Sequence, residues 1–150
     1  MNPLFRLKKY CAYRLHARKG KYAHSPFVYQ LSMAVFEKKS TLPNKNYGFD
    51  NDKYGQLMSK IAAYLNTENI QIMNIMPDSG RAYDYFDESA KYTDNNSVFI
   101  IKDLYRSSES AAVWEKIKAH PKTTVTFDLF HQGIVFFRRE SSKENFIIKY

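Results

Sequence analysis

Residues 70–101 have the sequence IQIMNIMPDSGRAYDYFDESAKYTDNNSVFII. The stretch begins and ends with the apolar runs Ile70–Met76 and Val98–Ile101, which are typical of parallel strands covered on both faces. The segment between them, near Gly80–Ser89, is compatible with a short helix, because about twenty residues suffice for a crossover of two to three turns with its loops. We therefore predict two adjacent parallel strands joined by a helix, the repeating unit of an α/β fold.

Three more β-rich runs follow a second segment that is compatible with a helix, at 107–120. These runs are Thr123–Leu129, Ile134–Arg138 and Phe146–Tyr150. The connections between them are short, at Gln132-Gly133 and Ser141–Lys143, so we expect hairpins rather than crossovers. The C-terminal end should therefore be an antiparallel meander that completes a mixed sheet of about five strands.

The first part of the chain is predicted to be helical. Between Pro3, which suits a first helical turn, and Gly20, which suits a helix end, four apolar residues recur at helical steps. They are expected to face the core, and they are Leu4, Leu7, Cys11 and Leu15. A second helix is expected to begin at Pro26, and a third is expected to be capped by Asp50 or Asp52.

Composition describes a single globular domain. The 150 residues are 44% hydrophobic, which is enough for a core and excludes a disordered chain. We expect one domain over residues 1–150, with a helical extension at 1–66 packed on an α/β unit at 67–150. The single cysteine excludes a disulfide scaffold, and the absence of a long apolar run excludes a membrane span. The first residues lack the features of a signal peptide, and together with the single cysteine this favours a cytoplasmic setting.

Positive charge is concentrated at the start of the chain. Residues 1–21 contain seven Lys and Arg residues and no Asp or Glu. Such a segment favours an anionic partner, whether nucleic acid, lipid headgroup or acidic protein, and the alternative is a solvated helix face. The bases expected to project away from the core are Arg6, Lys9, Arg14, Arg18 and Lys21.

Three stretches resemble a bacterial family of class I S-adenosylmethionine-dependent methyltransferases. They are HSPFVYQL (His24–Leu31), KYGQLMSKIAAYL (Lys53–Leu65) and AVWEKIKAHPKTTVTFDLFHQGIVFFRR (Ala112–Arg139). The resemblance implies a Rossmann-like sheet in which Ile70–Met76 is the first strand and Val98–Asp103 closes the parallel half. A full sheet of this kind has seven strands, and each βαβ unit takes ~30 residues, so the resemblance implies a truncated relative. The strand carrying the acid that binds the cofactor's ribose would be among those missing.

The resemblance also implies positions for cofactor contacts. In the family's first turn, aligned on Gly80, Asn74 stands at the acidic position and Met76 at a glycine position. Later in the chain, Lys102 stands where the family has the first aspartate of an Asp-Asp pair, and Asp103 stands at the second. The implied cofactor-binding positions are Asn74, Asp78, Ser79, Gly80 and Asp103. The alternative is an ordinary turn before a helix, with Asp103 as a cap or turn residue.

The altered positions and the missing strands predict a non-catalytic binding or assembly module that has lost S-adenosylmethionine binding. No catalytic residue, cofactor or metal site is expected, because the four histidines are isolated from other ligand-type side chains. The alternative is a methyltransferase that uses S-adenosylmethionine in a site completed by another subunit. Missing strands should also leave the edge beside Ile70–Met76 or Val98–Ile101 uncovered, which leads to the hypothesis of a homodimer.

Overall fold

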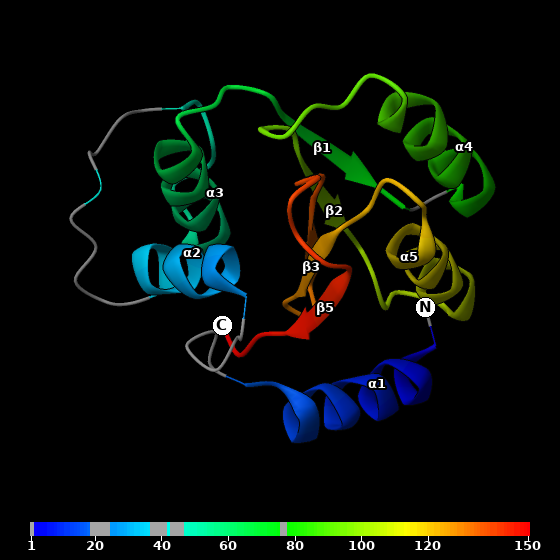
Figure 1. Ribbon diagram of the computed structural model, residues 1–150. Coiled ribbons are helices and arrows are strands. Elements are labelled where there is room, and N and C mark those ends of the chain that lie inside the picture. Colours follow the sequence, from blue (N-terminus) through cyan, green and yellow to red (C-terminus); the bar gives the residue numbers. More distant parts are fainter. Residues whose placement is uncertain (1, 19–24, 37–41, 43–46, 76–77) are drawn as a thin grey trace.

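The computed structural model describes residues 2–18, 25–36, 42, 47–75 and 78–150. It is an α/β structure in which a five-stranded mixed sheet has the order β1-β2-β4-β3-β5 (Figure 1). The strands are β1 (Ile70–Asn74), β2 (Val98–Lys102), β3 (Val125–Asp128), β4 (Gln132–Phe136) and β5 (Glu144–Ile147). The helices are α1 (Pro3–His16), α2 (Pro26–Phe36), α3 (Lys53–Leu65), α4 (Ser79–Ala90) and α5 (Ser108–Ala119).

The parallel pair predicted from the sequence is confirmed. β1 and β2 run parallel, with Ile70 opposite Val98 and Asn74 opposite Lys102, and α4 connects them. β2 lies between β1 and β4, so only β1 of this pair is an edge strand. The expectation that Val98–Ile101 could form an edge was therefore wrong, because the hairpin strand β4 covers it.

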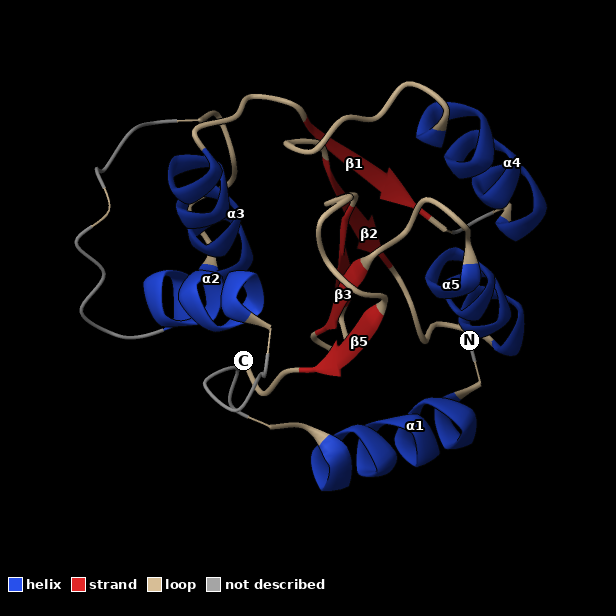
Figure 2. Cartoon of the chain, in the orientation of Figure 1, coloured by secondary structure: helices blue, strands red, loops and turns tan. Residues whose placement is uncertain are grey.

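Two helical layers cover the sheet, α2 with α3 on one face and α4 with α5 on the other (Figure 2). Alternate residues of β2 point to opposite faces, as the two-residue period of a strand requires. Ile100 is buried in the cluster that contains α2 and α3, and Phe99 is buried in the cluster that contains α4 and α5. Burial on both faces explains why the first four residues of β2 are all apolar.

The predicted C-terminal meander is only partly correct. β3 and β4 form an antiparallel hairpin, but its turn is Leu129–His131, and Gln132-Gly133 are the first residues of β4. β5 pairs in parallel with β3 rather than antiparallel with β4. The physical reason is the antiparallel direction of β4, which places its last residue, Phe136, beside the first residue of β3, Val125. Residues 137–143 can therefore pass the start of β3 and place β5 on its far side. There the Glu144 amide donates to the Thr124 carbonyl at 2.8 Å.

The direction in which α1 faces also differs from the prediction. Leu4, Leu7 and Leu15 are 77%, 58% and 81% exposed, and Cys11 is exposed as well, whereas Tyr13 is 8% exposed. The Tyr13 hydroxyl donates to the Ile148 carbonyl at 2.7 Å, just beyond β5. α1 therefore turns its aromatic side to the rest of the protein and its leucines outward. The helix itself lies outside the two helical layers (Figure 1).

Among the described residues, no helix is long and apolar enough to cross a membrane.

Candidate functional site

A cavity of about 330 Å³ lies at the carboxyl end of β2. This is the end at which open α/β sheets bind their ligands. The loop after β2, the β3–β4 turn and α1 together contribute its lining, which consists of Arg6, Asp103, Leu104, Tyr105, Arg106, Phe130 and His131.

Two lining residues have backbone angles in the left-handed region. Asp103 has φ 66° and Phe130 has φ 68°. Aspartate tolerates this conformation, but a bulky aromatic residue adopts it rarely, and such strain gathers at functional sites. The strain at Phe130 must be balanced by contacts around the turn.

Asp128 supplies those contacts from beneath the cavity. Its carboxylate is buried, and it accepts hydrogen bonds from the Phe130 amide at 2.8 Å and from the Trp114 indole nitrogen at 3.1 Å. The Tyr105 hydroxyl also donates to it. Burial, together with the charge of Asp128, raises the pKa of Tyr105 far above its usual value, so the phenol stays protonated and remains a donor. This network joins the loop after β2 to the β3–β4 turn.

α1 closes the other side of the cavity. The Arg6 guanidinium is 3.3 Å from His131 Nδ1 and lies 5.9 Å from the centre of the Phe130 ring. Burial, and then the charges of Arg6 and Lys53, lower the pKa of His131, so its ring is neutral at neutral pH and can accept from Arg6. Tyr10 packs against Phe130 with ring centres 5.0 Å apart, so the contact between α1 and the turn is aromatic as well as polar.

Of the five positions implied for the cofactor, only Asp103 lines this cavity. Asp103 lines the cavity and pairs with Arg106 at 3.7 Å, as expected for a turn residue. Asn74 is the exposed last residue of β1. Asp78 caps α4 by accepting from the Arg81 amide at 3.1 Å, and Ser79 and Gly80 form the first turn of that helix.

Gly80 shows no close approach that would require a glycine. A Cβ atom built there would meet its nearest neighbour, Asp78 Oδ1, at 3.6 Å, which is an ordinary contact. Met76, which occupies a glycine position in the resemblance, lies outside the described residues.

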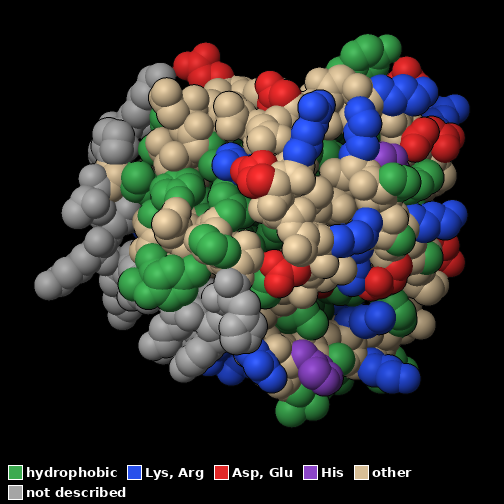
Figure 3. Space-filling view, viewed as in Figure 1, with side chains coloured by type: hydrophobic (Ala, Val, Ile, Leu, Met, Phe, Trp, Pro, Cys, Tyr) green, Lys and Arg blue, Asp and Glu red, His purple; other side chains and the backbone are tan. Residues whose placement is uncertain are grey.

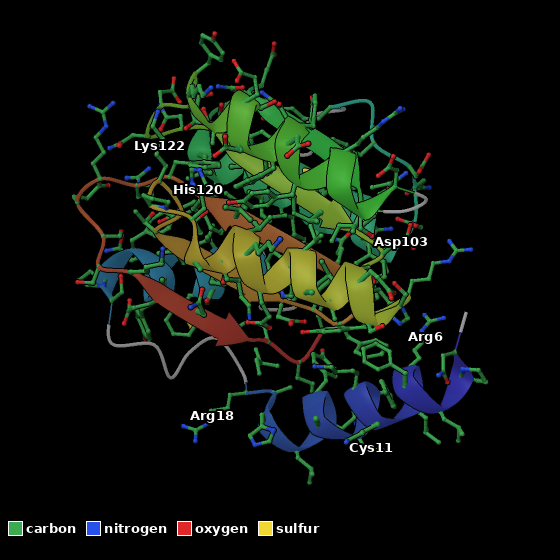
Figure 4. All side chains as sticks on the ribbon, turned by 90° about the vertical axis from the view of Figure 1, so that its right-hand side faces the viewer. Arg6, Cys11, Arg18, Asp103, His120 and Lys122 are labelled. Atoms are coloured by element: carbon green, nitrogen blue, oxygen red, sulfur yellow. The ribbon has the colours of Figure 1, made fainter. Side chains whose placement is uncertain are left out.

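The predicted anion-binding residues also divide into two groups. Arg6 faces the cavity, and Lys9 Nζ lies 5.6 Å from the Tyr105 ring centre, so both belong to the inner side of α1. Arg14 and Arg18 are exposed. In Figure 4, Arg6 lies between α1 and the rest of the chain, at the same end of the molecule as Asp103, whereas Arg18 points away. Lys21 lies outside the described residues.

Three titratable side chains that line the cavity each contact a neighbouring side chain. Tyr105 is held protonated and His131 is engaged with Arg6, while Asp103 is paired with Arg106. The described residues contain no group of three or more His, Cys, Asp or Glu side chains placed to hold a metal ion.

Sequence reasoning missed the residues that build this site, above all Phe130 and His131. His131 has no Cys, Asp or Glu at metal-ligand spacing in the sequence, and no local pattern predicts its contact with Arg6, because the two residues are 125 positions apart. The signal that could have located the turn is the run FDLFHQG, in which an acidic residue, Asp128, directly precedes the turn Leu129–His131.

Comparisons with protein-family models, curated proteins and solved structures found no match.

Proposed function

We propose that this protein is a non-catalytic binding module whose sheet is a partial, methyltransferase-like one and which does not bind S-adenosylmethionine. The observation that carries the proposal is the position of β1 at the edge of the sheet. In a Rossmann-like fold the ribose of the cofactor is bound by an acid on a strand beside the first one. Among the described residues, no strand pairs with β1 on the side away from β2.

The cover on the cavity at β2 supports the same proposal. Arg6 and Tyr10 of α1 pack on Phe130 at the carboxyl end of the sheet, where a substrate or cofactor of an open α/β enzyme would enter. Three further contacts hold α1 there, the Tyr13 hydroxyl and the two backbone hydrogen bonds that Arg18 makes with Ile147 and Lys149. A helix held in this way restricts access and offers a new surface on its outer side.

Isothermal titration calorimetry of the full chain with S-adenosylmethionine tests the proposal. We expect no binding heat at ligand concentrations up to about 1 mM. A dissociation constant above this concentration corresponds to a binding free energy less favourable than about −4 kcal/mol. A dissociation constant in the micromolar range that Gly80→Val abolishes would overturn the proposal. Gly80→Ala is the matched control, since a Cβ at this position has room.

A second candidate is a methyltransferase whose site is completed by another copy of the chain, and the free edge of β1 favours it. Ile72, in the middle of β1, is 43% exposed, and an edge strand with apolar side chains invites pairing with a second chain. Sedimentation velocity with and without S-adenosylmethionine separates the two candidates. A dimer that binds the cofactor, and that Ile72→Lys dissociates, would favour the enzyme, whereas a monomer without binding favours the module.

A further inference from the structure

The outer side of α1 carries an apolar stripe that the fold leaves uncovered. Leu4, Leu7 and Leu15 are more than half exposed, and Cys11 lies between them on the same side. Leu4 and the buried Tyr13 are separated by roughly two and a half helical turns, which places the stripe opposite the docked side. In Figure 3, hydrophobic side chains protrude at the lower margin of the molecule, over α1, beside Lys and Arg side chains.

Basic side chains border this stripe. Lys8 and Arg14 are exposed and, at about 100° per residue, lie on either side of the leucines. Arg18, just beyond the helix, is exposed as well. The segment 1–21 contains no acidic residue, so nothing in it opposes an anionic surface.

Three occupants could meet such a face, and the two features together select one. Nucleic acid would neutralise the bases but would leave the leucines in water. A second copy of α1 would cover the leucines but would bring two basic segments together. The surface of an anionic bilayer satisfies both features, because acyl chains accept the leucines while headgroups neutralise the bases.

We propose that α1 is an interfacial helix that binds the protein to anionic lipid surfaces through Leu4, Leu7 and Leu15. The helix has 14 residues, or about 21 Å, and would lie in the plane of the surface. Its inner side keeps the Tyr13 contact with Ile148, so binding requires no rearrangement of the sheet. This inference rests on the proposed binding function and names its partner, but it does not depend on the loss of S-adenosylmethionine binding.

Cys11, the one cysteine of the chain, allows a direct test. A polarity-sensitive fluorophore attached to its exposed thiol would enter the bilayer with the stripe. We expect its emission to shift to the blue with vesicles of phosphatidylglycerol and phosphatidylcholine in equal parts. With phosphatidylcholine alone, binding should be weaker by about tenfold or more, since each base near an anionic surface contributes roughly a factor of five.

Two paired variants separate the apolar and the electrostatic contributions, each measured by vesicle co-sedimentation of unlabelled protein. Leu4→Gln with Leu15→Gln should lower vesicle binding by about tenfold or more. Lys8→Gln with Arg14→Gln should lower it by about tenfold and weaken its salt dependence. The matched controls are Tyr85→Gln with Tyr92→Gln for exposed apolar area and Lys116→Gln with Arg139→Gln for charge, and both should bind like wild type.

Several results would overturn this inference. These are failure of the wild type to bind anionic vesicles, equal binding by the Leu4→Gln, Leu15→Gln variant, or tighter binding to a single-stranded oligonucleotide than to vesicles. A lipid-free dimer that the leucine changes dissociate would assign the stripe to a second copy instead. None of these results alters the outcome of the calorimetric titration, so failure here and failure of the proposed function are distinguishable.

Discussion

Leu4 and Tyr13 lie on opposite sides of α1, and it is the tyrosine that faces the protein. Tyr13 is 8% exposed and donates to the Ile148 carbonyl, while Leu4 is 77% exposed. A polar aromatic residue is thus the anchor, because its ring packs on Phe130 with centres 5.5 Å apart and its hydroxyl has a buried partner. The orientation of α1 determines both the covered cavity and the exposed stripe.

The Tyr13 anchor can be tested by removing its hydroxyl. Tyr13→Phe should lower the free energy of unfolding by about 1 kcal/mol, because the buried Ile148 carbonyl loses its donor. Tyr29→Phe, at an exposed position of α2, is the control and should leave stability unchanged. Urea denaturation of both variants provides the measurement, and equal stability would mean that α1 is not anchored through this hydroxyl.

Gly133 should be indispensable for the packing of Trp114. A Cβ at position 133 would lie 2.4 Å from Cη2 of the indole ring, so Gly133→Ala should destabilise the fold by about 1–3 kcal/mol. Gly80→Ala is the matched change in a helix with room for the methyl group, and it should be neutral or stabilising by up to about 1 kcal/mol. Thermal unfolding compares the two, and similar melting temperatures would contradict the packing described for β4.

Asp128 should hold the cavity together. Asp128→Asn keeps the size of the side chain but replaces one acceptor with a donor that faces the Trp114 and Tyr105 donors. We expect a loss of about 1–3 kcal/mol in unfolding free energy and altered tryptophan fluorescence. Asp84→Asn, at an exposed position in α4, is the control. A variant as stable as this control would show that the network does not support the turn.

The lowered pKa of His131 predicts a pH dependence of stability. Because the folded pKa lies below the unfolded value of about 6.5, the unfolded chain takes up this proton first as the pH falls. This residue should therefore make stability rise with pH up to about 6.5 and contribute no further slope above it. In melting curves from about pH 5 to 8, His131→Gln should reduce the slope below pH 6.5. An unchanged slope would contradict the lowered pKa that burial, and then the charges of Arg6 and Lys53, give to His131.

The central part of the fold could be predicted because its signals are local. Runs rich in apolar residues predicted the positions of β1 and β2, and the residues between these runs were too few for anything but a short crossover. Asp52, one of two predicted caps, does begin α3 by accepting from the Gly55 amide at 2.6 Å. Local rules of this kind depend only on neighbours in the sequence.

The remaining features depend on contacts between distant segments. A leucine period in α1 reveals an apolar stripe but not which side meets the protein, and the contact of Tyr13 with Ile148 spans most of the chain. A short connection before β5 suggested a hairpin, yet the same length also reaches the far side of β3. The cavity was missed for the same reason, because Arg6 and His131 come from opposite ends of the sequence.

The covered cavity and the lipid-binding stripe both depend on the orientation of α1, with its leucines outward and Tyr13 toward the protein. The reactivity of Cys11 tests this orientation most directly. Reaction of the single thiol with a chromogenic disulfide reagent can be followed in buffer and in urea. If the leucine stripe faces outward, the native rate should be within about threefold of the unfolded rate, since an exposed thiol needs no opening of the structure. Native protection of about a hundredfold or more would place the stripe against the protein and contradict this orientation.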